Sequence, residues 1–347
     1  SMVLITGGAG YIGSHVAKQL LEQGEDILVL DNLSTGFLKT IETLQKIRQF
    51  DFINLDLKEF EKVEKIFQNH KIDTVIHFAA FSQVSESVQK PMKYYMNNTV
   101  NTVNIVRCAS KYGVRKFIFS STAATYGEPI FKSDSQQTIT EEFETKPINP
   151  YGQSKLMSEH VIKDEAKVNS DFKYVIFRYF NVAGADVNYK DGVLLPRVGE
   201  SHDPETHLIP LIVKTALKKR KAITIFGEDY DTPDGTCIRD YIHVDDLADA
   251  HISAIEYLEK NESDAFNCGY GHGYSVKEII ESVKENTGLE FSVLKGDRRK
   301  GDPATLISDN NKIIKKMKWR PKYDDLGLII QSAYMWDKLI QMYLADQ

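Results

Sequence analysis

The chain has 347 residues, 42% hydrophobic and 27% charged, with 21 glycines and 10 prolines, a composition typical of a globular protein and not of a disordered or fibrous one. A formal charge of −6 offers no positive field for DNA or RNA, and no apolar run approaches the about 20 residues that a membrane-spanning helix needs. The three cysteines lie far apart without a CxxC spacing, so we expect no disulfide framework, no cysteine zinc site and a reducing, cytoplasmic location.

Short β-rich apolar runs alternate with helical stretches through the first half of the chain. Ile12, Val16 and Leu20 fall at helical spacing after the first run, and Gly24 ends that helix. The alternation predicts an α/β fold, a Rossmann-type doubly wound parallel sheet with helices on both faces. The predicted strands are residues 3–6, 26–30, 52–55, 74–78, 116–120 and 174–178.

The alternation stops after about residue 181, where long loops separate shorter elements. We therefore expect a first domain over residues 1–180 and a smaller C-terminal α/β lobe over residues 181–347. A strand end followed by a long helix, around residues 237–260, is expected to return to the first domain.

A glycine-rich turn at residues 7–13 follows the first strand and leads into the first helix. Glycines there let the backbone approach a pyrophosphate closely, and the helix N-terminus supplies N–H donors. Asp31 ends the second strand, where a carboxylate accepts hydrogen bonds from the adenosine ribose and repels the 2′-phosphate of NADP. The pattern predicts an NAD site. Asp56 and Leu57 are expected beside the adenine, with a plain strand cap as the alternative.

Three side chains form the predicted catalytic set. Tyr151 and Lys155 lie four residues apart, so on a helix they share one face. We expect the buried cation to lower the pKa of Tyr151 from its usual value of about 10 and so to create a general base. Thr122 ends a strand upstream, where its hydroxyl can bridge Tyr151 and a substrate oxygen.

Motifs along nearly the whole chain resemble the UDP-glucose 4-epimerases of the extended short-chain dehydrogenase/reductase superfamily. The resemblance implies a homodimer with tightly bound NAD that oxidises C4 of a UDP-hexose, with Tyr151 as base. The 4-keto intermediate then rotates and is reduced on its other face, which interconverts UDP-glucose and UDP-galactose. The motifs are residues 5–13, 31–33, 77–80, 86–91, 94–98, 149–152, 178–181, 234–244 and 299–302.

The resemblance makes residues 1–180 an NAD-binding domain and residues 181–347 mainly a nucleotide-sugar lobe. On NAD it places Gly7, Gly10, Tyr11, Ile12, Asp31, Asn32, Asp56, Leu57, Phe78, Ala79, Ala80, Ser82, Asn97, Lys155 and Tyr179. Around the nucleotide sugar it places Phe180, Asn181, His207, Leu208, Thr224, Phe226, Arg239, Tyr241, Val276, Arg299, Asp302 and Leu306. Core packing is the alternative for Phe180, Leu208, Phe226 and Val276.

Four positions depart from the common epimerase pattern. Ser82 replaces a lysine that often reaches the cofactor phosphates, Val182 stands where proline is frequent, and His207 replaces an asparagine that binds the diphosphate. Leu306 stands where the family has either a bulky tyrosine, which restricts it to UDP-glucose and UDP-galactose, or a small residue, which admits the N-acetyl sugars. Its intermediate volume predicts dual specificity.

Other functions share parts of this pattern. A nucleotide-sugar 4,6-dehydratase or reductase has the same cofactor turn, but dehydration needs extra carboxylates, and Ala123 and Ala124 follow Thr122 here. A non-catalytic NAD-sensing protein of the same fold need not keep the threonine, tyrosine and lysine. A calcium-loop-like stretch at residues 229–235 is interrupted by Pro233, so no metal is expected.

Overall fold

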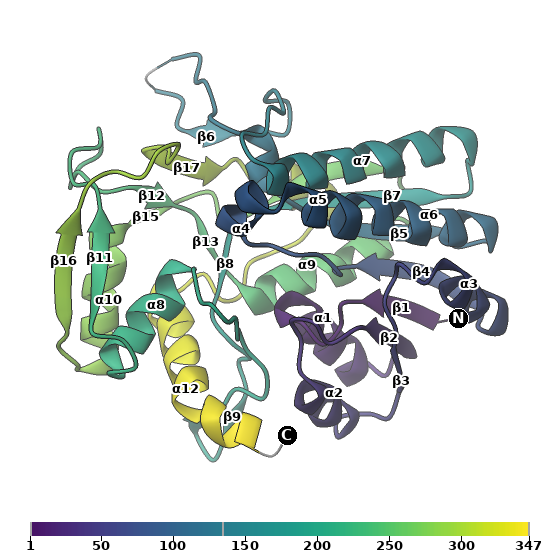
Figure 1. The fold of residues 1–347 in the computed structure, drawn as a ribbon, viewed down its shortest axis with the longest axis horizontal. Coiled ribbons are helices and arrows are strands. Elements are labelled where there is room, and N and C mark those ends of the chain that lie inside the picture. Colours follow the sequence, from purple (N-terminus) through teal and green to yellow (C-terminus); the bar gives the residue numbers. More distant parts are fainter. Residues whose placement is uncertain (1, 134, 346–347) are drawn as a thin grey trace.

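A seven-stranded parallel sheet forms the centre of the computed structural model, which describes residues 2–133 and 135–345 (Figure 1). The strand order is β14-β7-β5-β4-β1-β2-β3, with the reversal of a doubly wound sheet between β1 and β4. The predicted Rossmann-type fold is confirmed. The strands are β1 (Met2–Thr6), β2 (Ile27–Asp31), β3 (Asp51–Asn54), β4 (Ile72–His77), β5 (Lys116–Thr122), β7 (Lys173–Tyr179) and β14 (Asp264–Cys268).

Helices cover both faces of this sheet, because alternate strand residues point to opposite sides. Val3 and Ile5 of β1 belong to the apolar core on the side of α1, whereas Leu4 packs in the core on the side of α3 and α6. The helices of this part are α1 (Tyr11–Glu22), α2 (Leu38–Gln45), α3 (Phe60–Asn69), α4 (Val84–Gln89), α5 (Pro91–Tyr94), the π-helix η1 (Tyr95–Val100), α6 (Asn101–Lys111), the 3-10 helix η2 (Ala123–Tyr126) and α7 (Pro150–Val168).

Small sheets and helices beside the C-terminal edges of β1, β4 and β5 make up most of the rest of the chain, whereas α9 (Val244–Tyr257) packs against α1 and β5 (Figure 1). The sheets are β8 (Asn181–Ala183) with β13 (Tyr241–His243); β9 (Tyr189–Lys190) with β10 (Val193–Leu194); β11 (Ala222–Phe226) with β16 (Ser292–Gly296); and β15 (Tyr274–Ser275), β12 (Ile238–Arg239), β17 (Thr305–Ser308) and β6 (Thr138–Ile139) in that order. The helices are α8 (Leu208–Ala216), α9 (Val244–Tyr257), α10 (Val276–Thr287), α11 (Asn311–Met317) and α12 (Leu326–Ala345). No helix in the described ranges is long and apolar enough to cross a membrane.

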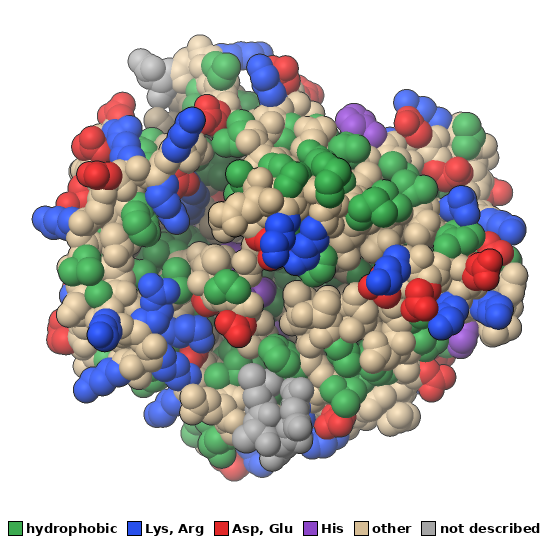
Figure 2. Space-filling view, in the orientation of Figure 1, with side chains coloured by type: hydrophobic (Ala, Val, Ile, Leu, Met, Phe, Trp, Pro, Cys, Tyr) green, Lys and Arg blue, Asp and Glu red, His purple; other side chains and the backbone are tan. Residues whose placement is uncertain are grey.

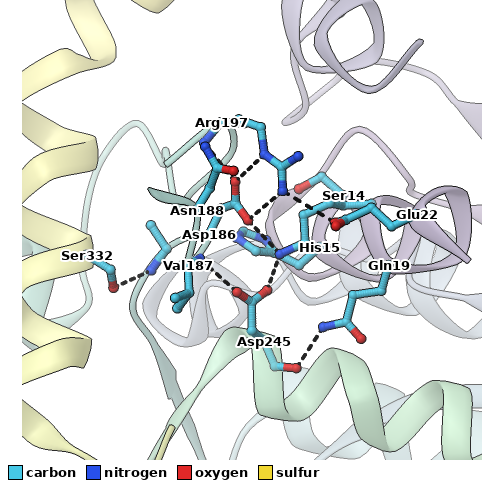
Figure 3. Close-up of polar contacts among 12 residues, drawn as sticks. Ser14, His15, Gln19, Glu22, Asp186, Val187, Asn188, Arg197, Asp245 and Ser332 are labelled. Atoms are coloured by element: carbon cyan, nitrogen blue, oxygen red, sulfur yellow. Dashed lines mark hydrogen bonds and ion pairs between the residues drawn. The ribbon is translucent and has the colours of Figure 1, made fainter. Parts of the chain in front are cut away.

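A buried ionic cluster joins α1 to segments that follow β8 and begin α9 (Figure 3). The Lys18 ammonium lies 2.7 Å from Asp186 Oδ1 and 2.5 Å from Asp245 Oδ1, and all three side chains are buried. Arg197 also contacts Asp186, at 2.7 Å from Nε to Oδ2. Because α1 starts at the glycine-rich turn, this cluster fixes the turn relative to the C-terminal half.

Candidate active site

The turn between β1 and α1 brings the backbone close to the end of β4. Gly7 has a φ of 74°, and a Cβ added there would lie 2.7 Å from the backbone nitrogen of Ala79. Only glycine fits such a position. Gly10 begins α1 without a side-chain cap, and Tyr11 and Ile12 follow in the first turn. The turn therefore leaves a helix N-terminus without a side-chain cap, of the kind that binds anions.

Asp31 lies at the C-terminal end of β2, directly beside this turn. Its carboxylate accepts hydrogen bonds from the backbone N–H groups of Ala9 (3.0 Å) and Leu33 (2.7 Å). Burial raises the pKa of Asp31, and the two N–H donors oppose that shift. Asn32 continues toward β3, where its Nδ2 donates to Asp56 Oδ2 at 3.1 Å and Leu57 is buried. The structure thus brings the predicted adenosine residues together.

The loop after β4 is held by the π-helix η1. Asn98 accepts from the Phe81 N–H (2.9 Å), donates to the Phe81 carbonyl (3.0 Å) and donates to Ser154 of α7 (3.1 Å). Asn97, a predicted cofactor residue, lies beside it and donates to Asn98 Oδ1. Ser82 is exposed in this loop. A π-helical turn is uncommon and frequently marks a functional site.

Phe78 and Tyr179, both predicted to contact the cofactor, meet at His251 of α9. The Phe78 and His251 rings lie 5.1 Å apart, and the Tyr179 hydroxyl hydrogen-bonds His251 Nε2. Burial lowers the pKa of His251 to about 4, so the ring is neutral and packs as part of the core. The helix α9 therefore supports the sheet edge on which the predicted site lies, next to Ala79 and Ala80.

The predicted catalytic residues come from β5 and α7. Thr122 is the last residue of β5 and accepts the Ala124 N–H at 3.0 Å, while Tyr151 and Lys155 lie on successive turns of α7. The Thr122 side chain lies close enough to the Tyr151 phenol to act against the rise of its pKa. Asn149 caps α7 by accepting the Gly152 N–H, which fixes where the helix, and hence Tyr151, begins.

The expected lowering of the Tyr151 pKa by Lys155 is not found among the chain's own groups, where the pKa is raised. Burial raises the pKa of Tyr151, only the Thr122 side chain opposes the shift, and Lys155 has no resolved effect on it. The Lys155 ammonium instead donates to the Ser120 carbonyl at 2.8 Å. Burial lowers the pKa of Lys155 to about 7, and Glu159 opposes that change.

Sequence reasoning missed the ionic network behind Lys155. Glu159 is fully buried one turn further along α7, where it accepts from Ser121 Oγ (2.6 Å) and pairs with Arg178 of β7 (2.7 Å). Arg178 also donates to the Tyr126 hydroxyl at 3.1 Å. The sequence did contain one indication of this network. Glu159 follows Lys155 by the same four residues that separate Lys155 from Tyr151, so all three lie on one face of the helix.

The predicted sugar-nucleotide residues gather at one end of β12 and β17. Arg239 Nη2 lies 3.2 Å from Asp302 Oδ1, Arg299 lies 3.3 Å from Asp302 Oδ2, and the Arg299 guanidinium stands 4.6 Å from the ring centre of the exposed Phe226. Leu306 pairs in register with Arg239 and packs against the cluster of Phe180 and Ala123 that adjoins Thr122.

The other predicted substrate residues lie on neighbouring elements. Asn181 and Tyr241 are register partners in the β8–β13 pair, Leu208 begins α8, Val276 begins α10 and Thr224 lies within β11. The Nδ1 atom of His207 lies 3.0 Å from Glu205 Oε1 and 3.1 Å from Glu200 Oε2. The contacts of these residues with a ligand stay predictions.

A model of the NAD dependent epimerase/dehydratase family matches residues 3–269. The chain belongs to this family. A relative from Lacticaseibacillus casei, a UDP-glucose 4-epimerase, is 45% identical over 335 residues, with 96% of each chain covered. The structure of a UDP-Glc/GlcNAc 4-epimerase from Campylobacter jejuni is 51% identical with a TM-score of 0.85, covering 97% of this chain and 99% of that one. A UDP-glucose 4-epimerase from Brucella ovis in complex with NAD is 42% identical with a TM-score of 0.87, covering 96% and 97%.

These comparisons confirm the resemblance to UDP-glucose 4-epimerases that the motifs indicate, and the name of the NAD dependent epimerase/dehydratase family agrees with the predicted cofactor. The epimerase/dehydratase name covers two reactions, so the choice between them depends on the residues around Tyr151.

Proposed function

We propose that the protein interconverts UDP-glucose and UDP-galactose by transient oxidation and re-reduction at C4. The observation that carries the proposal is the placement of Thr122 at the end of β5 close to Tyr151, with the buried Lys155 one helical turn further along α7, at the same edge of the sheet as the glycine-rich turn. When bound, NAD supplies the hydride acceptor and donor for this chemistry. Identity of 45% with a UDP-glucose 4-epimerase supports the choice of substrate.

The cofactor-binding assignment rests on the fit of the residues to NAD. The Gly7 backbone and the N-terminus of α1 would hold the pyrophosphate, and Asp31 would accept from the adenosine ribose. Asn32, Asp56 and Leu57 would line the adenine. The negative charge of Asp31 favours NAD over NADP, because the 2′-phosphate would meet a second anion.

Tyr151 is the proposed general base and acid at the sugar 4-hydroxyl. Thr122 would hold the hydroxyl toward the phenol, and Lys155 would position the phenol from the same helix face. Burial alone makes Tyr151 a weaker acid. A cationic nicotinamide ring provides positive charge that acts in the opposite direction.

Epimerisation is favoured over dehydration because the positions after Thr122 carry no acid or base. Ala123 is buried in an apolar cluster, and the Ala124 N–H is bonded to Thr122. Removal of water from the sugar requires carboxylates for proton transfer at C5 and C6. The test is to convert UDP-galactose with purified protein and to analyse the product by chromatography and mass spectrometry. An unchanged mass is expected, and a loss of 18 mass units, about one water, would favour the dehydratase.

Arg239, Arg299, Asp302 and Phe226 are proposed to bind the uridine diphosphate. Two guanidinium groups suit a pyrophosphate, and in the structure both contact Asp302. Asp302 would accept from the ribose, and the exposed face of Phe226 would take the uracil. Figure 2 shows the surface hollowed between the side bearing β11 and β16 and the side bearing α4 and α5.

Leu306 is proposed to admit N-acetylated sugars as well, because it packs against the apolar cluster that contains Phe180 and Ala123, the residue that follows Thr122. Similarity to a UDP-Glc/GlcNAc 4-epimerase supports this choice. We expect wild type to convert UDP-N-acetylglucosamine and Leu306→Tyr to lose that activity while it keeps UDP-galactose. Equal inactivity of wild type and Leu306→Ala on the N-acetyl sugar would contradict the proposal.

An apolar stripe along α4 to α6 is proposed to mediate homodimer formation. The stripe consists of Val88, Met92, Met96, Val100 and Val103. Its exposed members recur about every four residues, and Met92 is 66% exposed; Figure 2 shows hydrophobic side chains gathered over these helices. Such a patch is unusual on a monomer. A Met92→Glu, Met96→Glu variant should elute as a monomer in light-scattering chromatography, whereas Val168→Glu, at another exposed apolar position, should not. A monomeric wild type at micromolar concentration would refute the dimer.

A further inference from the structure

Two glutamates and two histidines between β10 and α8 bring their donor atoms together. Their potential ligand atoms all lie within 4.8 Å of one another. Among the described residues, this is the group of histidine, cysteine or acidic side chains that could hold a metal ion. The four residues are Glu200, His202, Glu205 and His207. They occupy one loop of eight residues, outside the proposed catalytic site.

The donor atoms are spaced as the corners of a small coordination site. Glu200 Oε2 lies 3.1 Å from Nδ1 of both His202 and His207. His202 Nδ1 lies 3.5 Å from Glu205 Oε2, and His207 Nδ1 lies 3.0 Å from Glu205 Oε1. Zinc bonds to nitrogen and oxygen of about 2.0–2.2 Å place tetrahedral ligands about 3.3–3.6 Å apart. The four carboxylate–imidazole distances lie within a few tenths of an ångström of that range, and the remaining donor pairs lie within 4.8 Å.

One donor atom has no other use within the described residues. His202 Nδ1 is buried and makes no hydrogen bond within the described residues, although carboxylate oxygens of Glu200 and Glu205 lie 3.1 Å and 3.5 Å away. The side chains of Glu200 and Glu205 are only 6% and 5% exposed, and two buried carboxylates need two positive charges nearby.

We infer that this loop binds one divalent cation of the zinc class, through one carboxylate oxygen each of Glu200 and Glu205 and Nδ1 of His202 and His207. Two imidazoles with two carboxylates favour zinc or a similar transition metal over magnesium or calcium, which prefer oxygen ligands alone. The ion would balance the two carboxylate charges. The inference assigns His207 to the metal and not to the sugar diphosphate, and it replaces the expectation that the chain has no metal site.

The surroundings indicate what the ion would do. The His202 ring lies edge-on to Tyr11 at 6.3 Å, and Tyr11 donates to the Gly184 carbonyl at 2.6 Å. The loop is also held by Gln83, which donates to the Pro204 carbonyl at 3.1 Å, and it leads directly into α8. A metal here would fix the loop between the proposed cofactor turn and α8, without supplying a reacting group.

Zinc titration of the purified full-length chain tests this inference. The protein is treated with a chelator, desalted and titrated with Zn²⁺ against a chromophoric competitor, and Co²⁺ is added in parallel for its visible spectrum. We expect one Zn²⁺ per chain with a dissociation constant below about 1 μM, and a tetrahedral Co²⁺ spectrum. His202→Ala should weaken zinc binding at least about 10- to 100-fold. That factor is typical for loss of a residue that only hydrogen-bonds a metal ligand, and His202 would be a ligand itself.

His160→Ala is the matched control, because His160 is exposed on α7 far along the chain from the loop. It should bind zinc as wild type does. Glu200→Gln, which keeps the size of the side chain, serves if His202→Ala does not fold. Absence of stoichiometric zinc binding by wild type would overturn the inference without any variant and would indicate that protons on the two histidines balance the glutamates. Equal binding by His202→Ala or Glu200→Gln and wild type would overturn it as well.

Discussion

Removal of the Lys18 ammonium should destabilise the protein by about 3–5 kcal/mol, the cost of leaving a partner of a buried ion pair without its counter-charge. In Lys18→Met, Asp186 keeps Arg197 at 2.7 Å and the Arg197 backbone N–H at 3.0 Å. Among the described residues, the hydrogen bond that remains to the Asp245 carboxylate comes from the Val187 N–H, at 2.9 Å (Figure 3). Most of the cost therefore arises at Asp245, at the joint between α1 and α9.

A second substitution at Asp245 locates that cost. Asp245→Asn removes the orphaned charge, so the double variant Lys18→Met, Asp245→Asn should recover about 2 kcal/mol, a coupling within the range seen for contacting residues. Lys167→Met is the control, since its partner Asp164 lies 3.4 Å away with both side chains largely exposed. It should change the free energy of unfolding by less than about 1 kcal/mol.

Urea unfolding, followed by circular dichroism and by tryptophan fluorescence, measures these free energies where the two transitions coincide. A Lys18→Met variant within about 1 kcal/mol of wild type would show that the cluster is not a buried ion pair. Strict additivity of Lys18→Met and Asp245→Asn would show that Asp245 is not the group left without a partner.

Three further predictions concern catalysis, cofactor choice and pH. Tyr151→Phe should lower kcat for UDP-galactose by about 10²- to 10⁴-fold at unchanged thermal stability, and a kcat within tenfold of wild type, about 1.4 kcal/mol, would exclude Tyr151 as the base. Asp31→Asn, which keeps an oxygen acceptor for the Ala9 N–H, should reduce the preference for NAD over NADP about tenfold or more in binding titrations; an unchanged ratio of dissociation constants would argue against the assignment. Lys18 lowers the pKa of Asp245, so the pair stabilises the fold above the ordinary carboxyl pKa of about 4 and loses this contribution as the pH falls through the lowered value. The stability difference between wild type and Lys18→Met should thus be largest near neutral pH and should shrink in acid, and a constant difference down to about pH 3 would contradict the pairing.

The strands of the Rossmann half were predictable because each is a short buried apolar run, and their observed ends differ from the predicted ones by at most two residues. The seventh strand, β14, was not predicted. Its sequence, Asp-Ala-Phe-Asn-Cys, has a polar residue, Asn267, within its buried C-terminal part. Asn267 is tolerated there because it accepts from the Tyr126 hydroxyl at 2.6 Å and donates to the Ile139 carbonyl at 2.7 Å, tertiary contacts that local pattern does not contain.

Spacing along one element was readable in the site, whereas partners from other elements were not. Tyr151 and Lys155 were placed on one face of α7 by their separation, but the pairing of Glu159 with Arg178 joins α7 to β7. The pKa of Tyr151 was misjudged for the same reason. Helical spacing says that Lys155 is near, and only the fold shows that its ammonium turns to the Ser120 carbonyl.

Transfer of the C4 hydrogen tests the proposed epimerisation most directly. UDP-galactose carrying deuterium at C4 is incubated with purified protein in ordinary water, without added NAD, and the UDP-glucose formed is analysed by mass spectrometry and NMR. Oxidation and re-reduction by a bound cofactor return the same hydrogen, so the product should keep its deuterium at C4. Loss of the deuterium to solvent, or turnover only while added NAD is consumed, would contradict the proposed reaction.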